Sequence, residues 1–387
     1  MGNNAGAVFA AAAAVLLAVL RARSHDDGFR TTSDIGDGAN WLRWKYESLS
    51  SIVPYTNAWR FSDARAGDTM HAALWNGTAW DLHLSNRLAV DATLPILLGT
   101  DRYHVVPAGE SAKVLDAGCG WGGTIFFAEG ERERAADVHV PPSRLDAPPA
   151  PAYEGITLSP TQAAAATATA AARGLSDRAV FRVASFESPL PREAYAAIFA
   201  IESLEHSSNL TATLRNLGAA LRPGGALVLV TDLLAVGASD PLRRGEADDV
   251  LRLYRDHWCG PHTQWAPPAS LGTWRSLLAD AAGIRLTTQQ HLSGGLYQRP
   301  RWALAAYLAV LRAVHHAATA LGLGQLAMQT SNQLGGVSRE LLLHDQLIEY
   351  TLLVGRRASR GARGDAQPLL DESHVEVEVR PALVPPY

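Results

Sequence analysis

The sequence predicts an α/β fold with a doubly wound, Rossmann-like sheet and helices on both faces. Short apolar runs alternate with helical stretches through the middle of the 387-residue chain, which is typical of a parallel sheet. The first run ends in an acidic residue and a cluster of glycines, as a buried strand does when it enters a tight turn. Hydrophobic residues make up 47% of the chain, which is enough for a sizeable core.

The predicted strands and helices alternate along the chain. The first strand covers residues 112–115 and the second covers residues 153–158. An alanine-rich helix over 160–173 follows, with Ser159 as its N-cap and Pro160 at its first position. The other predicted strands are 180–183, 196–201, 226–231, 284–288 and 347–354. The other predicted helices are 274–282 and 301–321, and residues 258–268 are predicted to form a loop. Right-handed crossovers between parallel strands then fix most of the topology.

Composition divides the chain into a main domain and flanking segments. We assign residues 109–357 to the main domain, 28–108 to a helical lead-in or lid, and 1–27 to a hydrophobic anchor or targeting segment. Residues 129–152 are rich in proline and charge, so we predict a surface insertion there. The polar residues 358–387 are predicted to be a disordered tail.

Residues 5–20 are almost wholly apolar and are followed by Arg21 and Arg23. This run is shorter than the ~20 residues that span a bilayer, so a membrane anchor, a cleaved targeting peptide and a soluble helix all remain open. If the run is retained as an anchor, the arginines place the main domain on the cytoplasmic side of the membrane. A signal that targets the chain to an organelle is another interpretation of residues 5–20.

The charge balance, the cysteines and the histidines limit the kinds of partner and site that we expect for this chain. Lys and Arg total 34 against 38 for Asp and Glu, a net charge of −4, so the chain lacks the basic excess of nucleic-acid-binding proteins. Cys119 and Cys259 are the only cysteines, and we expect free thiols. The 13 histidines show no recognised metal-ligand spacing, so we predict no metal site.

The glycine turn after the first strand is the strongest functional signal. Gly118, Gly120 and Gly122 let the backbone approach a bulky ligand closely. Glycines at 118, 120 and 123 also satisfy G-x-G-x-x-G, so the turn alone does not select between cofactors. Asp116 stands two residues before the first glycine, and a Leu-Arg-Pro-Gly-Gly turn at 221–225 enters the fifth strand.

Together these features resemble class I S-adenosylmethionine-dependent methyltransferases, in which the acidic residue after the first strand contacts the cofactor's amino-acid end. The segment Gly-Ile-Thr-Leu-Ser-Pro-Thr-Gln at 155–162 resembles the subgroup that contains tocopherol methyltransferases and cyclopropane fatty acid synthases, and the resemblance covers roughly residues 59–357. It implies S-adenosylmethionine as the cofactor. The implied cofactor-binding residues are Asp116, Gly118, Gly120, Trp121, Gly122, Thr157, Leu158, Gln162, Ser185, Phe186, Glu187 and Ile201.

The resemblance also implies which part of the cofactor these residues contact. Thr157, Leu158 and Gln162 match residues that line the ribose and adenine, although most class I enzymes have an acidic residue at the end of this strand. The segment 184–187 resembles the one that brackets the adenine, and Phe186 could equally be part of the core.

The candidate catalytic residues are Glu205, His206 and His71. The first two belong to a Glu-His pair like that of the subgroup, after the fourth strand, and ligands of open parallel sheets lie beyond the carboxyl ends of the strands. Glu205 fits a general base, a partner for a cationic substrate or a loop-stabilising residue. His71 lies in a segment, 68–75, that resembles one closing over the cofactor, with Ala73 in place of the usual glycine.

The sequence therefore predicts methyl transfer by in-line displacement to a small-molecule or lipid-like acceptor. Residues 59–117 contain no cysteine, which argues against cyclopropane formation. The aromatic and histidine side chains expected near the acceptor, which would cage a quaternary ammonium group or pack as a lid, are Tyr254, His257, Trp258, His262 and Trp265. The alternatives are a catalytically weak, membrane-tethered interaction module and a dinucleotide oxidoreductase.

Overall fold

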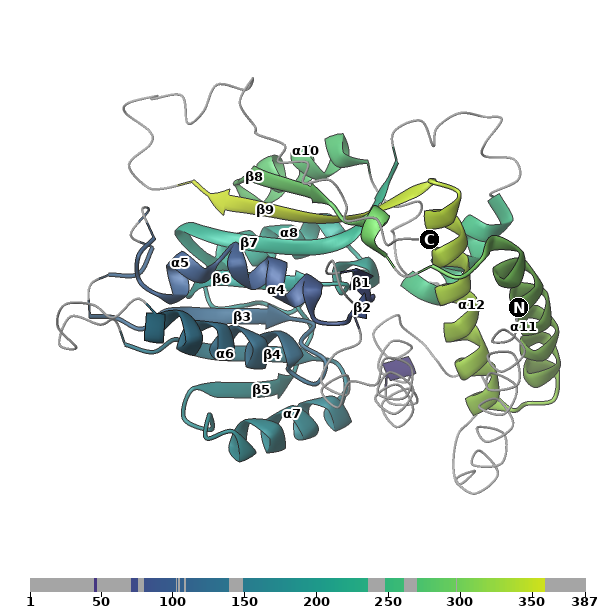
Figure 1. The fold of residues 1–387 in the computed structure, drawn as a ribbon, viewed down its shortest axis with the longest axis horizontal. Helices are drawn as coiled ribbons and strands as arrows, with labels where there is room; N and C mark the ends of the chain where they lie inside the picture. The colour runs from purple at the N-terminus through teal and green to yellow at the C-terminus, as the bar shows by residue number, and fades with distance from the viewer. Residues whose placement is uncertain are drawn as a thin grey trace.

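The computed structural model describes most of the main domain and part of the lead-in. The described residues are 45–46, 71–75, 80–101, 103, 105–107, 109–138, 149–235, 248–260, 270–296 and 298–358. They form a seven-stranded sheet in the order β5-β4-β3-β6-β7-β9-β8 (Figure 1). Its strands are β3 (Lys113–Ala117), β4 (Ala152–Thr157), β5 (Ala179–Val183), β6 (Tyr195–Ile201), β7 (Leu221–Leu234), β8 (Ile284–His291) and β9 (Ile348–Arg357). A separate pair joins β1 (Leu74–Trp75) to β2 (Trp80–Asp81).

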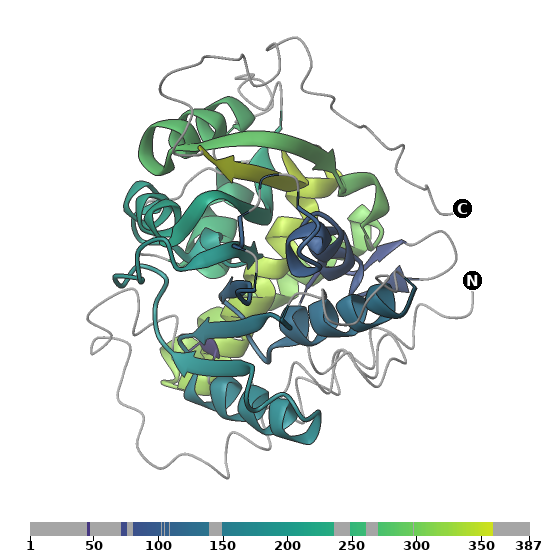
Figure 2. The same cartoon turned by 90° about the vertical axis from the view of Figure 1, so that its left-hand side faces the viewer.

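Helices cover both faces of the sheet. The α-helices are α4 (Leu84–Asp91), α5 (Leu94–Leu97), α6 (Gly123–Val138), α7 (Pro160–Ala172), α8 (Leu210–Ala220), α10 (Leu271–Ala282), α11 (Arg301–Ala320) and α12 (Gly324–His344). Two short 3-10 helices are η4 (Leu204–His206) and η6 (Ser293–Gly295), and η5 (Tyr254–Cys259) is a π-helix. Figure 2 shows the sheet between two layers, with α4 and α6 on one side and α8 and α10 on the other. The predicted fold class is confirmed.

Six of the seven strands run in one direction, and only β9 runs in the opposite direction. From β5 to β7 the strands run in one direction, so their carboxyl ends meet at one edge, which we call the carboxyl edge. The alternation of strands and helices predicted a parallel sheet, and the structure adds β9, which runs antiparallel to both β7 and β8. The chain enters β9 at the carboxyl edge, where Ile348 lies opposite Leu234, because α11 and α12 have returned it there. The central strand β6 is buried along its whole length, as its apolar sequence requires.

Residues 129–138 continue helix α6 and are not part of a surface insertion, which corrects our prediction. Glu129 is buried in this helix, and its carboxylate accepts hydrogen bonds from Arg132 at 2.7 Å and from Arg178 at 2.8 Å. Burial alone would raise the pKa of Glu129, but these guanidinium groups lower it to about 2. Paired charges therefore let a charged stretch pack on the sheet. Residues 139–148 lie outside the described part of the chain.

Helix α12, which we did not predict, lies between α11 and the sheet (Figure 1). Small and polar residues interrupt its apolar pattern, and one of them explains its position. A Cβ atom at Gly335 would lie 2.5 Å from the backbone nitrogen of Trp258, so only glycine permits this contact between α12 and η5. Trp258 and Cys259 belong to the π-helix η5, whereas we had expected a loop to begin at residue 258.

The described helices do not combine the length and the hydrophobicity that spanning a bilayer requires. The apolar run at 5–20 and the tail beyond residue 358 lie outside the described residues. Cys119 and Cys259 are buried free thiols, as predicted.

Candidate active site at the carboxyl edge

The turn after β3 needs glycine for two different reasons. Gly118 has a φ of +100°, and a Cβ atom there would lie 2.4 Å from the Cβ atom of Ser203. Gly120 has a φ of +52°, yet no described atom lies within 4 Å of the Cβ it would carry. The first glycine therefore lets the turn pack against the loop after β6. The second leaves open space beside the turn, as a ligand site requires.

Asp116 is the acidic residue in β3, two residues before Gly118, and its side chain is 2% exposed. Burial raises the pKa of Asp116 to about 7, although a hydrogen bond from Thr124 opposes the change. Its Oδ2 atom has no hydrogen-bond partner among the described residues. A buried carboxylate oxygen without a donor indicates a place for a cationic or hydrogen-bond-donating ligand group.

The end of β4 is fixed by the N-cap of α7. The Ser159 hydroxyl accepts from the Gln162 backbone nitrogen at 3.1 Å, as the sequence predicted for this helix start. The Thr157 hydroxyl donates to the Gln162 side-chain oxygen at 2.8 Å, and both residues are buried. Leu158, between them, is half-buried. The cap therefore holds the three residues that we expect near the ribose and adenine at the carboxyl edge.

The loop after β5 is tied to the loop after β6 by Glu187. Its carboxylate accepts from the hydroxyl groups of Ser208 at 2.9 Å and of Ser207 at 3.2 Å. The Ser185 hydroxyl accepts from the Glu187 backbone nitrogen at 3.1 Å. Phe186 is half-buried against the core. The predicted adenine segment thus lies at the same edge as the glycine turn.

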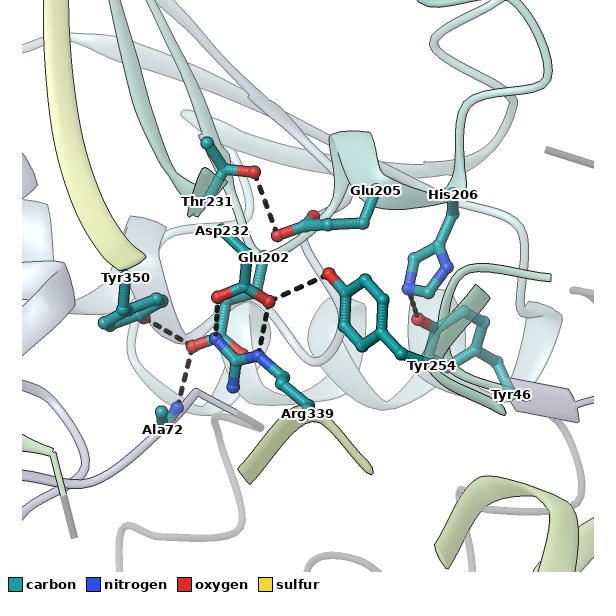
Figure 3. Close-up of polar contacts among 10 residues, drawn as sticks. All are labelled: Tyr46, Ala72, Glu202, Glu205, His206, Thr231, Asp232, Tyr254, Arg339 and Tyr350. Carbon is teal, nitrogen blue, oxygen red and sulfur yellow. Dashed lines mark hydrogen bonds and ion pairs between the residues drawn. The ribbon is translucent and has the colours of Figure 1, made fainter. Parts of the chain in front are cut away.

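Glu202, directly after β6, has a φ of +48°, a conformation that costs a non-glycine residue free energy. Its Oε1 atom accepts from the Tyr350 hydroxyl at 2.5 Å and from the Ala72 backbone nitrogen at 2.8 Å (Figure 3). Its Oε2 atom lies 3.7 Å from Nη1 of Arg339. Glu202 therefore holds the segment that contains His71 against the end of β6. Burial lowers the pKa of His71.

A buried polar cluster lies where α12 meets β7 (Figure 3). Arg339 donates to Asp232 from Nε at 2.6 Å and from Nη2 at 2.8 Å, and the Tyr254 hydroxyl donates to the same carboxylate at 2.9 Å. The Thr231 hydroxyl donates to Oε1 of Glu205 at 3.1 Å. Oε2 of Glu205 has no partner within the described chain.

Glu205 is the carboxyl group of this cluster that makes no ion pair with a described residue. The Arg339 guanidinium pairs with Asp232 and Glu202, while Glu205 is 1% exposed. Burial first, and then the charge of nearby Asp232, raise the pKa of Glu205 to about 8. A carboxyl group with such a pKa exchanges its proton close to neutral pH, as acid-base catalysts do.

His206 is held at both of its ring nitrogens. Nδ1 lies 3.0 Å from the carbonyl oxygen of Cys259, which can only accept, so Nδ1 carries the proton. Nε2 therefore accepts from the Tyr46 hydroxyl at 2.5 Å (Figure 3). Burial, with a smaller effect from nearby Lys45, lowers the pKa of His206 to about 3. The imidazole is thus neutral throughout the physiological pH range.

Trp258 lies close to two basic side chains of the chain itself. Nζ of Lys45 and Cζ of Arg339 each lie 5.4 Å from a ring centroid of Trp258. Lys45 also donates to the backbone carbonyls of Trp258 at 2.9 Å and His257 at 3.2 Å. Burial lowers the pKa of Lys45 to about 7, so Arg339 is the lasting cation beside the indole. A basic side chain already in this position argues against an empty quaternary-ammonium cage. His262 and Trp265 lie outside the described residues.

A model of the methyltransferase domain family matches residues 96–294, just over half of the chain. The chain belongs to this family. The matched segment begins in α5, ends in η6 and includes the glycine turn, Glu205 and Asp232. The resemblance to class I S-adenosylmethionine-dependent methyltransferases is confirmed, and with it S-adenosylmethionine as the cofactor.

The relatives of this methyltransferase include two proteins that are named tocopherol O-methyltransferases. A probable chloroplastic tocopherol O-methyltransferase of Oryza sativa subsp. japonica is 29% identical over 38% of the chain, and one of Arabidopsis thaliana is 28% identical over 50%. The matches span 38% and 53% of those two plant enzymes. The 27-O-demethylrifamycin SV methyltransferase of Amycolatopsis mediterranei is 27% identical over 71% of the chain and 82% of its own length.

Solved structures share the fold of this methyltransferase at low sequence identity. A geranyl diphosphate methyltransferase covers 83% of the chain and 98% of its own length, with a TM-score of 0.52 and 17% identity. The cyclopropane synthase MmaA2 of Mycobacterium tuberculosis covers 81% and 98%, with a TM-score of 0.51 and 16% identity. The [4+2]-cyclase SpnF covers 82% and 95%, with a TM-score of 0.50 and 20% identity. Because a cyclase shares the fold, the fold alone does not fix the reaction.

The structure brings the predicted residues to one edge and adds others that sequence reasoning missed. Tyr46, Arg339 and Tyr350 come from segments far apart in the sequence, and nothing in their local pattern marks them. Asp232 carried a usable signal, since it follows the apolar run of β7 at the edge where ligands of such sheets bind.

Proposed function

We propose that the chain transfers a methyl group from S-adenosylmethionine to a hydroxyl group of a small organic acceptor. The carboxylate of Asp116 carries this proposal, because it is buried with one oxygen that has no partner in the described chain. The ammonium group of the cofactor's methionine portion is the donor that this oxygen needs. Gly120 supports the same assignment, since no atom of the described residues lies within 4 Å of the Cβ atom that it would carry.

The residues around the carboxyl edge fit the rest of the cofactor. We assign Thr157, Leu158 and Gln162 to the ribose and adenine, and Ser185, Phe186 and Glu187 to the adenine. The remaining contacts are assigned to Gly118, Trp121, Gly122 and Ile201, and His71 stays a candidate catalytic residue. S-adenosylmethionine supplies a methyl group on positively charged sulfur, which is already activated for displacement. The chain therefore has mainly to orient the acceptor and exclude water. Such positioning lowers the activation free energy of a reaction by up to ~7–11 kcal/mol.

Glu205 is the group that we assign to remove the acceptor's proton. Its Oε2 atom has no partner among the described residues, Thr231 fixes its other oxygen, and its pKa of about 8 suits a base near neutral pH. His206, with a pKa of about 3, is too weak a base for a hydroxyl group. We assign it a positioning role, because it links Tyr46 to the carbonyl of Cys259.

The acceptor class rests on the relatives and on Trp258. Two plant relatives are named tocopherol O-methyltransferases, and the Amycolatopsis relative is named for a 27-O-demethyl substrate, so each name indicates an oxygen acceptor. Arg339 already lies against Trp258, which leaves the indole less available to a cationic amine product. A neutral, hydroxyl-bearing and partly apolar molecule fits both observations.

A transfer assay tests this proposal. The full chain is incubated with methyl-labelled S-adenosylmethionine and a panel of phenols, alcohols and lipid-soluble quinols, each paired with its O-methylated form. We expect S-adenosylhomocysteine to form with a free hydroxyl acceptor and not with its blocked partner. Before the transfer assay, calorimetry measures whether the chain binds S-adenosylhomocysteine or NADH. Absence of S-adenosylhomocysteine binding would overturn the cofactor assignment, whereas binding without any transfer would favour the catalytically weak interaction module.

We also propose that residues 5–20 direct the chain to a membrane or an organelle. Their apolar composition supports this role, as does the description of both plant relatives as chloroplastic. The test expresses the full chain with a C-terminal tag in plant or algal cells. Loss of the segment, seen by N-terminal sequencing, indicates a targeting peptide, and resistance to carbonate extraction indicates an anchor. An intact chain in the soluble fraction would contradict the proposal.

A further inference from the structure

Helix α11 has one face that packs and one that does not. Its buried side chains, which contact α12, are Leu304, Leu308, Leu311 and Ala318. Figure 1 shows α11 at the outer margin of the molecule, with α12 between it and the sheet. Spacings of three, four and seven residues put these buried side chains on one side of the helix.

The opposite side of α11 is an apolar stripe, whose exposed members are Trp302, Ala306, Ala309, Val310, Ala313, Ala317 and Ala320. Trp302 is 68% exposed and Val310 is 58% exposed. Four of the six large exposed hydrophobic side chains in the described part of the chain lie on α11 or in the turn after it: Trp302, Val310, Leu321 and Leu323. Scattered exposed apolar residues are ordinary, but such a concentration on one helix marks a contact surface.

The charges of α11 are all positive. Its 20 residues include no Asp or Glu, although the whole chain has a net charge of −4. At 100° per residue, Arg301, Arg312 and His316 fall along one flank of the apolar stripe, and all three are exposed. Arg301 pairs with Asp345 at 2.7 Å, whereas Arg312 makes no ion pair within the described residues. An apolar stripe with a basic flank is the pattern of helices that lie on anionic lipid surfaces.

We propose that the outer face of α11 binds the surface of an anionic lipid bilayer. The stripe enters the boundary between headgroups and acyl chains, and Arg312 contacts lipid phosphates. This inference goes beyond the proposed methyl transfer and does not depend on it. Because α12 carries Arg339, the bound bilayer would lie on the far side of α12 from the carboxyl edge.

The test uses the full chain, so the face must be distinguished from residues 5–20. The only native cysteines are buried, so a single introduced cysteine can carry an environment-sensitive fluorophore. One variant is Val310→Cys, and its matched control is Val183→Cys on β5, where the valine is 50% exposed. With phosphatidylglycerol vesicles we expect a blue shift and quenching by nitroxide lipids for the label at 310 and neither for the label at 183.

Three further outcomes decide the proposal. Arg312→Glu in the labelled Val310→Cys chain is expected to weaken partition into phosphatidylglycerol vesicles about fivefold or more, and to leave the weaker binding to phosphatidylcholine unchanged. An unshifted label at 310 on vesicles that bind the chain would overturn the proposal, because residues 5–20 would then account for binding. A shift without vesicles that grows with protein concentration, with a doubled mass by light scattering, would instead identify an interface between copies.

Discussion

The guanidinium group of Arg339 donates to both carboxylate oxygens of Asp232, at 2.6 Å and 2.8 Å. Arg339 belongs to α12 and Asp232 to β7, so this pair joins helices α11 and α12 to the carboxyl edge of the sheet. The same guanidinium lies 3.7 Å from Glu202, whose backbone is strained. The pair therefore organises the carboxylates beside Glu205, which itself makes no ion pair among the described residues.

Arg339→Met is expected to lower the free energy of unfolding by about 3–5 kcal/mol, because Asp232 would remain buried and unpaired. The double variant Arg339→Met, Asp232→Asn should recover part of this loss, since it removes the orphaned charge. Urea denaturation at pH 7 measures both. Arg301→Met is the control, because its ion pair with Asp345 is exposed and contributes about 0–1 kcal/mol. Equal losses for Arg339→Met and Arg301→Met would contradict the role given to the buried pair.

Gly120→Val is expected to abolish S-adenosylhomocysteine binding, measured by calorimetry. The added side chain would occupy the open space beside the turn, and its backbone would be strained by about 1–2 kcal/mol. Gly174→Val is the matched control, with a φ of +69° against +52° and no described atom near its Cβ position. Gly174 follows α7, at the end of that helix away from its N-cap. The assigned site is wrong if both variants lose stability alike and both still bind the ligand.

The sequence predicted the elements whose pattern is local. The buried strand β6, the N-cap at Ser159 and the glycine turn at Gly118 each depend on residues close together in the chain. Asp116 and Glu205 could likewise be assigned to the carboxyl edge from sequence, since each follows or ends a predicted strand and parallel strands bring their ends together.

What the sequence could not predict depends on tertiary pairing. The charged end of α6 packs only because Arg178, from another segment, pairs with Glu129. Helix α12 has no clean apolar period, and its place depends on the contact of Gly335 with η5. The partners of Glu202 and His206 come from Tyr350 and Tyr46, and a local sequence pattern carries no information about such distant contacts.

Asp116→Asn is expected to change how stability depends on pH in the absence of cofactor. The pKa of Asp116 is raised from 3.8 to about 7, so its contribution to stability is fully present below pH 3.8 and is lost as pH rises through 7. At 1.36 kcal/mol per pKa unit the loss is at most about 4 kcal/mol, and Asp116→Asn should remove it. Urea denaturation at pH 5 and pH 8 measures the difference.

The same Asp116→Asn variant should bind S-adenosylhomocysteine about 10- to 100-fold more weakly, because it lacks a charge-assisted hydrogen bond worth about 1.5–3 kcal/mol. Calorimetry at pH 8, where the wild-type carboxylate is ionised, gives the comparison. A flattened pH dependence with unchanged affinity would show that the buried carboxylate does not contact the cofactor.

Glu205→Gln is expected to remove the rise of turnover with pH. In the wild type the fraction of Glu205 able to accept a proton increases up to its pKa of about 8, so kcat should climb between pH 6 and pH 8 and then level off. The glutamine variant should lose about 10²–10⁴-fold in kcat and keep its affinity for S-adenosylhomocysteine. His206→Asn is the comparison, since a positioning residue should lower kcat less and leave the rise with pH in place. If His206→Asn removes that rise and Glu205→Gln retains it, the proton passes to the imidazole and the two roles must be exchanged.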